Sequence, residues 1–88
     1  MKYQKYQKGL PGRVFLTSAG IDFVAQELRA LYIFGDRLTM AMLRGWVEDI
    51  EARIAAGEGA EMEIASTETS TGRPETVTVP AEFLGFRS

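Results

Sequence analysis

The sequence predicts an α+β fold, in which an antiparallel helical hairpin is followed by a β-hairpin and a short N-terminal strand is allowed. Three observations support this prediction. Apolar residues recur with the period of a helix between residues 21 and 54, and with the period of a strand from residue 61 onwards. Glycines at positions 35 and 57 divide the helical pattern, and the short connection at residues 35–37 favours antiparallel neighbours.

The first helix is expected to begin at Thr17 or Ser18, because both residues are good N-caps. Gly35 is expected to end it, since glycine is favoured just after helix C-termini. Residues 13–16 are β-prone and form a candidate strand before the helix. The expected apolar face consists of Ile21, Val24, Ala25, Leu28, Leu31 and Tyr32.

The second helix is expected to run from a cap at Thr39 to a stop at Gly57. Its apolar stripe predicts that Trp46 is a core residue where the two helices meet. Gly45 is unusual inside a helix, because glycine costs about 1 kcal/mol there relative to alanine. It belongs to a strip of small residues, which fits close packing either against the first helix or against a helix of a second subunit. The stripe consists of Leu43, Trp46, Val47, Ile50 and Ile54, and the strip of Ala41, Gly45 and Ala52.

Residues 61–79 are predicted to form the β-hairpin. Met62 and Ile64 alternate with glutamates, and Val77 and Val79 alternate with threonines. Pairing Ile64 with Val77 and Met62 with Val79 places these apolar side chains on one face and leaves residues 67–74 as the loop. The apolar tail at residues 83–86 is expected to be covered rather than left in water.

The 88-residue chain contains no histidine and no cysteine. This composition excludes Cys/His zinc sites, thiol chemistry and Ser-His-Asp triads. Glu61 and Glu63 are expected to point outward from a solvated strand. The Gly-Glu-Gly segment at residues 57–59 follows a helix, whereas a phosphate-binding loop would precede one. We therefore predict that the chain is not an enzyme and has no catalytic, cofactor-binding or metal-binding residue.

Charge is distributed unevenly along the chain, whose formal net charge is −2. Residues 1–12 form a predicted flexible basic arm, and residues 13–88 a single small domain whose second half is acidic. An acidic surface repels phosphates, so nucleic acid is disfavoured as a partner. No apolar run approaches the roughly 20 residues that cross a bilayer, and no signal peptide is recognisable. We expect a cytoplasmic protein without membrane contact.

Two groups of side chains are predicted to bind a partner. The first helix carries a second apolar face with Phe23, Ile33 and Phe34, which one helix and one hairpin cannot also cover. Either the C-terminal tail folds back over this face or a partner covers it, and a homodimer would provide such a partner. The second group is acidic and would attract a basic protein surface. It consists of Glu48, Asp49 and Glu51 on the second helix.

These features predict a non-enzymatic protein-binding module, such as a small inhibitor, adaptor or accessory factor, including those that phages encode. The alternative is a DNA-binding regulator, because two helices followed by a hairpin resemble the element order of winged-helix domains. The helix and the hairpin that would contact DNA are acidic in this chain, whereas DNA-binding surfaces are basic. Protein binding is therefore the preferred interpretation.

Overall fold

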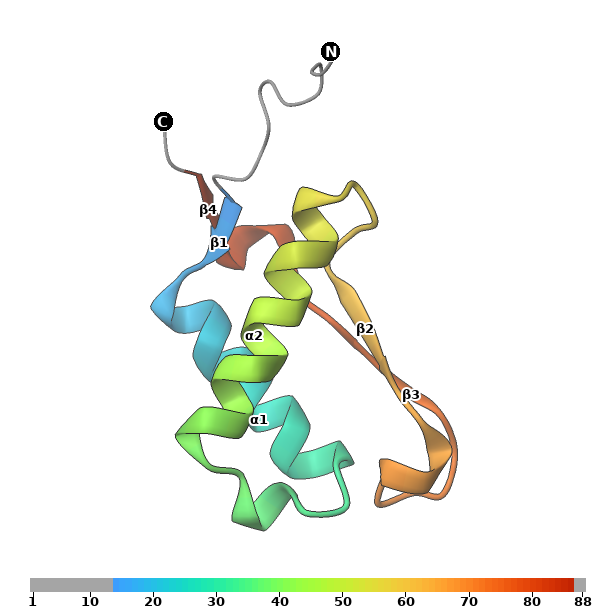
Figure 1. The fold of residues 1–88 in the computed structure, drawn as a ribbon. Coiled ribbons are helices and arrows are strands. Elements are labelled where there is room, and N and C mark those ends of the chain that lie inside the picture. The colour runs from blue at the N-terminus through green and yellow to red at the C-terminus, as the bar shows by residue number, and fades with distance from the viewer. Residues whose placement is uncertain (1–13, 87–88) are drawn as a thin grey trace.

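In the computed structural model, which describes residues 14–86, two antiparallel helices lie side by side over a β-hairpin (Figure 1). The predicted α+β fold is confirmed, and the basic arm at residues 1–12 lies outside the described residues. Two small antiparallel sheets accompany the helices. The elements are β1 (Val14–Leu16), α1 (Ser18–Leu31), α2 (Met40–Ala55), β2 (Glu61–Ile64), β3 (Glu75–Thr78) and β4 (Leu84–Phe86).

Helix α1 begins where its capping residues predict. The Thr17 hydroxyl accepts a hydrogen bond from the Gly20 N–H at 3.1 Å, which satisfies one of the free donors of the first turn. The helix ends at Leu31, so the expectation that Gly35 ends it is wrong. The chain leaves the helix where it meets the hairpin loop. There the Ser70 N–H donates a hydrogen bond to the Leu31 carbonyl at 2.8 Å.

Gly35 instead allows a close backbone contact. It is buried in a short 3₁₀ helix, Gly35–Arg37, that packs beneath the last turn of α1. A Cβ at this position would lie 2.6 Å from the Arg29 Cα and from the Leu28 carbonyl oxygen, a separation that real Cβ atoms do not show. Glycine is therefore required here for space.

Helix α2 has the predicted caps at both ends. The Thr39 hydroxyl accepts from the Met42 N–H at 3.1 Å. At the C-terminus the Glu58 N–H donates to the Arg53 carbonyl at 2.8 Å, and Gly57 has a φ of 80°. This arrangement is a Schellman motif, in which glycine supplies the left-handed residue just after the helix.

The hairpin of β2 and β3 forms, but in a different register from the predicted one. Met62 pairs with Val77 and Ile64 with Glu75, a shift of two residues from the expected pairing. Strand β2 ends early because residues 66–68 turn into a 3₁₀ helix, with the Glu68 N–H donating to the Ala65 carbonyl at 2.8 Å. Since side chains alternate with a period of two, the shift leaves the same apolar residues facing the helices.

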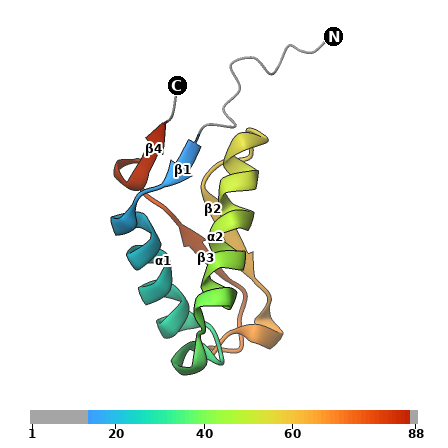
Figure 2. The same ribbon diagram turned by 60° about the vertical axis from the view of Figure 1, so that its left-hand side comes forward.

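The C-terminal segment folds back and pairs with β1 to form a second ribbon at one end of the helical pair (Figure 2). Phe15 lies opposite Gly85, where a Cβ would overlap the Phe15 ring. The Phe83 ring packs on Phe23 of α1 with centroids 5.3 Å apart. The tail therefore covers part of the second apolar face of α1, one of the two expected arrangements.

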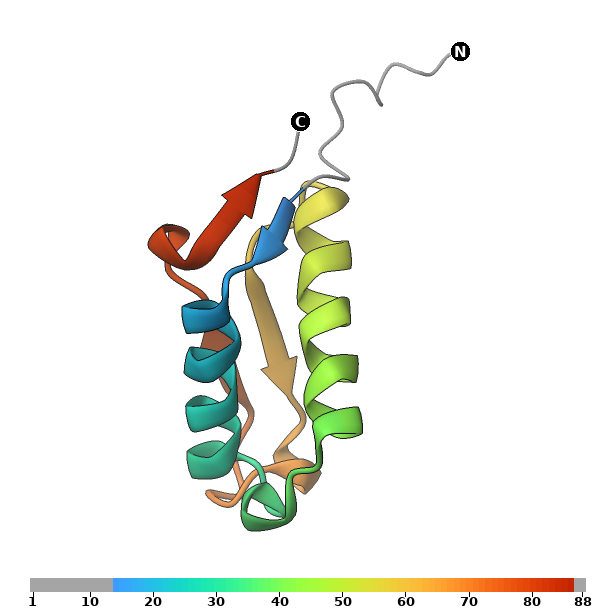
Figure 3. The same ribbon diagram turned by 90° about the vertical axis from the view of Figure 1, so that its left-hand side faces the viewer.

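The core lies between the helical pair and the hairpin, which spans the gap between the helices (Figure 3). Strand β2 lies against α2 and β3 against α1. Trp46 is only partly buried and packs against this core, so the prediction that it is a core residue is wrong. The buried residues that form this core cluster are Leu16, Val24, Ala25, Leu28, Leu43, Val47, Ile50, Ile64, Val77 and Val79.

Candidate functional site

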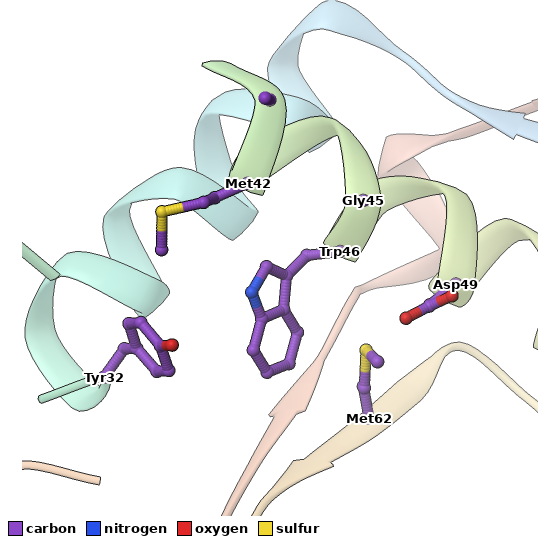
Figure 4. A pocket seen from close by; sticks show the side chains of 7 residues that line it. Tyr32, Met42, Gly45, Trp46, Asp49 and Met62 are labelled. Atoms are coloured by element: carbon purple, nitrogen blue, oxygen red, sulfur yellow. The ribbon is translucent and has the colours of Figure 1, made fainter. Parts of the chain in front are cut away.

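Trp46 and its neighbours form an open groove of about 300 Å³ between helix α2, strand β2 and the residue that follows α1 (Figure 4). We call this concavity the Trp46 groove. It is lined by Tyr32, Ala41, Met42, Gly45, Trp46, Asp49 and Met62.

Aromatic rings form one wall of the groove. Tyr32 meets Trp46 edge to face, with ring centroids 5.8 Å apart and an interplanar angle of 72°. Phe34 extends this group of aromatic rings, since its ring centroid lies 6.2 Å from the ring centroid of Tyr32. Figure 4 shows the Met42 and Met62 side chains on either side of the indole. Tyr32 is held in place because it bridges to Thr69 of the hairpin loop.

Gly45 leaves the groove open on the side of α2. It is exposed, and a Cβ built on it would meet no atom within 4 Å. The interpretation that the small-residue strip packs against α1 is therefore wrong, because Gly45 and Ala41 line an open surface. Within the described chain nothing requires glycine at this position of the helix.

Asp49 is the one charged residue of the lining, and it is exposed. Among residues 14–86 the ion pairs are Arg53 with Glu58 at 3.2 Å and Arg73 with Glu75 at 3.7 Å, so the Asp49 carboxylate has no ion-pair partner there. This part of the sequence also contains all twelve acidic residues of the chain but only five of its ten basic ones. The groove therefore combines an apolar lining with one carboxylate that is unpaired within the described residues.

The three apolar residues predicted to bind a partner do not share one helix face. Ile33 and Phe34 lie beyond the end of α1, and their exposed fractions are 49% and 50%. Phe23 is half-buried against Phe83, more than two helical turns before the end of α1. The placement of all three on a single face of the helix is therefore wrong, and Phe34 alone connects to the groove, through Tyr32.

The three predicted acidic residues also have different surroundings. Glu48 and Asp49 are exposed on α2, as expected for residues that meet a partner. Glu51 is half-buried, and its carboxylate accepts a hydrogen bond from the Leu16 N–H of β1 at 2.8 Å. Glu51 therefore has a role within the fold.

The helical pattern of the sequence places Tyr32 and Trp46 in the core and therefore does not predict the groove. One signal was available, because tryptophan is large and is rarely buried completely. Trp46 lies at the margin of the Leu43–Val47–Ile50 stripe of α2, where a large ring extends past the core.

The groove does not have the composition of a catalytic or metal-binding site. It contains a single carboxylate and a phenol, without a nucleophile beside a base. Among the described residues, no group of three or more acidic, histidine or cysteine side chains is placed to hold a metal ion. None of the helices in residues 14–86 is long and apolar enough to span a membrane.

Comparison of the chain with protein-family models, with curated proteins and with solved structures gave no match.

Proposed function

We propose that this chain is a non-enzymatic protein-binding module, and that the Trp46 groove receives an apolar side chain of its partner. The observation that carries this proposal is the convergence of Tyr32, Trp46 and two methionines on an open concavity. Tryptophan and tyrosine are enriched among the residues that dominate binding energy at protein interfaces. Methionine adapts its flexible side chain to irregular partners.

The charge around the groove indicates the chemistry of that partner. Asp49 in the lining and the neighbouring Glu48 are exposed acids, and Arg53 is already engaged by Glu58. A partner surface with lysine or arginine around an apolar side chain would complement these acids and be steered towards them. Such a module fits the role of a small inhibitor, adaptor or accessory factor acting on a basic protein surface.

The groove can be tested without disturbing the core, because Gly45 is exposed and unobstructed. In Gly45→Leu the new side chain stands in the groove lining, where a Cβ meets no atom within 4 Å, and it should obstruct a partner side chain, while the helix gains a residue of better propensity. Ala52→Leu is the matched control, since Ala52 is exposed on the same helix outside the groove lining. The wild-type chain and both variants would serve as immobilised baits in an extract of the native host.

The proposal requires that a protein retained by the wild-type chain and by Ala52→Leu is lost with Gly45→Leu. Trp46 is the only tryptophan of the chain, so its fluorescence reports whether the purified partner reaches the groove. Equal retention of the same proteins by all three baits would contradict the proposal. So would retention of duplex DNA that weakens as salt rises, the behaviour of the alternative DNA-binding regulator.

Self-association through the turn between the helices is part of the same proposal. Ile33 and Phe34 are half exposed there and are followed by Asp36 and Arg37, which lie outside the ion pairs of the described residues. In a two-fold contact each surface meets itself, so Asp36 of one copy can face Arg37 of the other. This arrangement joins an apolar centre to complementary charges, and it favours a homodimer.

A further inference from the structure

The alternation of hydrogen-bonded and non-hydrogen-bonded pairs between β2 and β3 shows the direction in which each backbone N–H and C=O group of β3 points. The Val79 N–H donates to the Ala60 carbonyl at 2.8 Å, and Glu61 lies opposite Thr78. In an antiparallel pair, hydrogen-bonded and non-hydrogen-bonded positions alternate. Thr76 and Thr78 are therefore non-hydrogen-bonded positions, and their N–H and C=O groups point away from β2.

The two edges of this ribbon differ in protection. On β2 the Glu61 and Glu63 side chains are exposed, and Arg53 Nε donates to the outward Glu61 carbonyl at 2.8 Å. Charged side chains of this kind prevent strand addition. On β3 the corresponding residues are the uncharged Thr76 and Thr78, and no hydrogen bond from another described element reaches their backbone. Among the described residues, the β3 edge is thus left open.

The helical layer is wider than the ribbon that it covers. Packed helices lie about 8–10 Å apart, whereas neighbouring strands are about 4.8 Å apart. Since β2 lies against α2 and β3 against α1, the outer flank of α1 extends beyond the β3 edge (Figure 3). Phe23 on α1 remains only half-buried, although Phe83 packs on it. One further strand would fit beside β3 under this flank.

We propose that the free edge of β3 binds an extended segment of another protein as a third strand. The segment would pair with Thr76 and Thr78, in the interval between Pro74 and Pro80. Alternate side chains of the segment would face α1 and should be apolar. The others would lie on the outer face, where Glu61 and Glu63 are exposed, and should be basic. This site is separate from the Trp46 groove and does not depend on it.

A second copy of the chain does not fit this edge. Two β3 strands paired about a two-fold axis would be about 4.8 Å apart and would keep their helices on the same face of the sheet. Each α1 extends past its own β3 edge, so the two α1 helices would occupy the same space, because helices need about 8 Å or more. The occupant must be a strand that carries no helix above it.

Amide hydrogen exchange followed by NMR tests the proposal on the full chain. The probe is the acetylated and amidated peptide Lys-Val-Lys-Val-Lys-Val-Lys, and the control peptide has proline in place of the central valine. In the free chain the Thr76 and Thr78 amides should exchange rapidly, while the Val77 amide is protected by the ladder. The probe should slow exchange at Thr76 and Thr78 by at least about tenfold, and the control peptide should not.

A pair of variants tests the same edge from the side of the protein. In Thr78→Pro the lost N–H is one that the ladder does not use, so the hairpin can form while the edge loses a donor. Thr78→Val keeps the N–H and serves as the matched control. Peptide affinity should fall by about tenfold in the proline variant relative to the valine variant, once circular dichroism shows that both fold. Gly45→Leu should bind the peptide as the wild-type chain does, which separates this site from the groove.

Several outcomes would overturn the proposal. Slow exchange at Thr76 and Thr78 in the free chain would mean that the edge is already occupied, either by another part of this chain or, where protection rises with concentration, by a second copy. Unchanged exchange at millimolar probe would mean that the edge does not accept a strand. Equal effects of the two peptides would mean that the basic side chains bind the acidic surface without forming a ladder.

Discussion

Gly35 lies in the turn between the two helices and Gly45 lies within α2, and the two glycines have opposite surroundings. A Cβ at Gly35 would press on the backbone of α1, whereas a Cβ at Gly45 would meet no atom within 4 Å. The first glycine is explained by packing within the chain. The second weakens its helix by about 1 kcal/mol relative to alanine without any gain inside the fold. Its location in the lining of the Trp46 groove supports a role in binding.

Replacing Gly45 by alanine should stabilise the protein. The substitution removes backbone freedom from the unfolded chain and adds a methyl group in free space. We expect the free energy of unfolding in urea to rise by about 1 kcal/mol. A fall in stability would show that the backbone of α2 at this position needs glycine.

Replacing Gly35 by alanine should have the opposite effect. The new methyl group has to displace the 3₁₀ segment from the end of α1, because its neighbours there are backbone atoms. A loss of about 1–3 kcal/mol is expected in the same urea titration, as for other overpacked sites. An unchanged midpoint would mean that this turn moves freely away from α1.

At the scale of elements, β1 depends on a carboxylate from α2. The Leu16 N–H donates to Glu51, and Leu16 itself is buried in the core. Glu51→Ala removes the acceptor and should lower the free energy of unfolding by about 1–2 kcal/mol, while Glu51→Gln keeps an acceptor oxygen and should lower it less. The exposed neighbour gives the control, since Glu48→Ala should change stability by less than about 0.5 kcal/mol. Equal effects at both positions would contradict the structural role of Glu51.

The features predicted correctly from the sequence are those that short-range interactions determine. Thr17 and Thr39 cap their helices through hydroxyl groups that reach an N–H three residues ahead. Gly57 ends α2 through a local left-handed turn. Each of these signals is complete within a few residues, so the helix starts, the end of α2 and the presence of a hairpin could be read directly.

One error comes from a contact between distant residues, and the other from a turn that the alternating pattern does not indicate. The end of α1 is determined by Ser70, which lies far along the chain and binds the Leu31 carbonyl. The register of β2 and β3 depends on the 3₁₀ helix in their loop, whereas alternation of side chains allows any shift by two residues. Neither the end of α1 nor the register of the hairpin is indicated by the composition of the neighbouring residues.

The candidate site was less accessible to prediction than the fold. Helical periodicity places Trp46 and Leu43 on the same broad face, but only the packed structure shows that Leu43 is buried and Trp46 reaches the surface. Phe23 was predicted to be covered either by the tail or by a partner, and the return of Phe83 covers it in part. Exposure depends on all neighbours of a side chain, which a single sequence does not list.

For the molecule as a whole, the half-exposed turn between the helices leads to a prediction about the oligomeric state in solution. If two copies meet there, sedimentation at micromolar concentration should give about twice the chain mass of 9.7 kDa. Phe34→Glu should shift the mass towards that of one chain, because it places a charge in the centre of the contact. Met40→Glu is the control, since Met40 is already 68% exposed outside this turn. A single-chain mass at every concentration would contradict the homodimer.

The pairing of β1 with β4 also determines how the protein responds to mechanical load. Val14 lies opposite Phe86 at the outer end of this ribbon, and Leu16 lies opposite Leu84 at its inner end. A pulling force transmitted through the residues before Val14 and after Phe86 therefore loads the ladder one hydrogen bond at a time, which is the weaker of the two geometries in which strands can be separated. The next link is the bond from the Thr17 N–H to the Phe83 carbonyl, beside the first turn of α1. Tension on the flanking chain would thus open the molecule from this ribbon first.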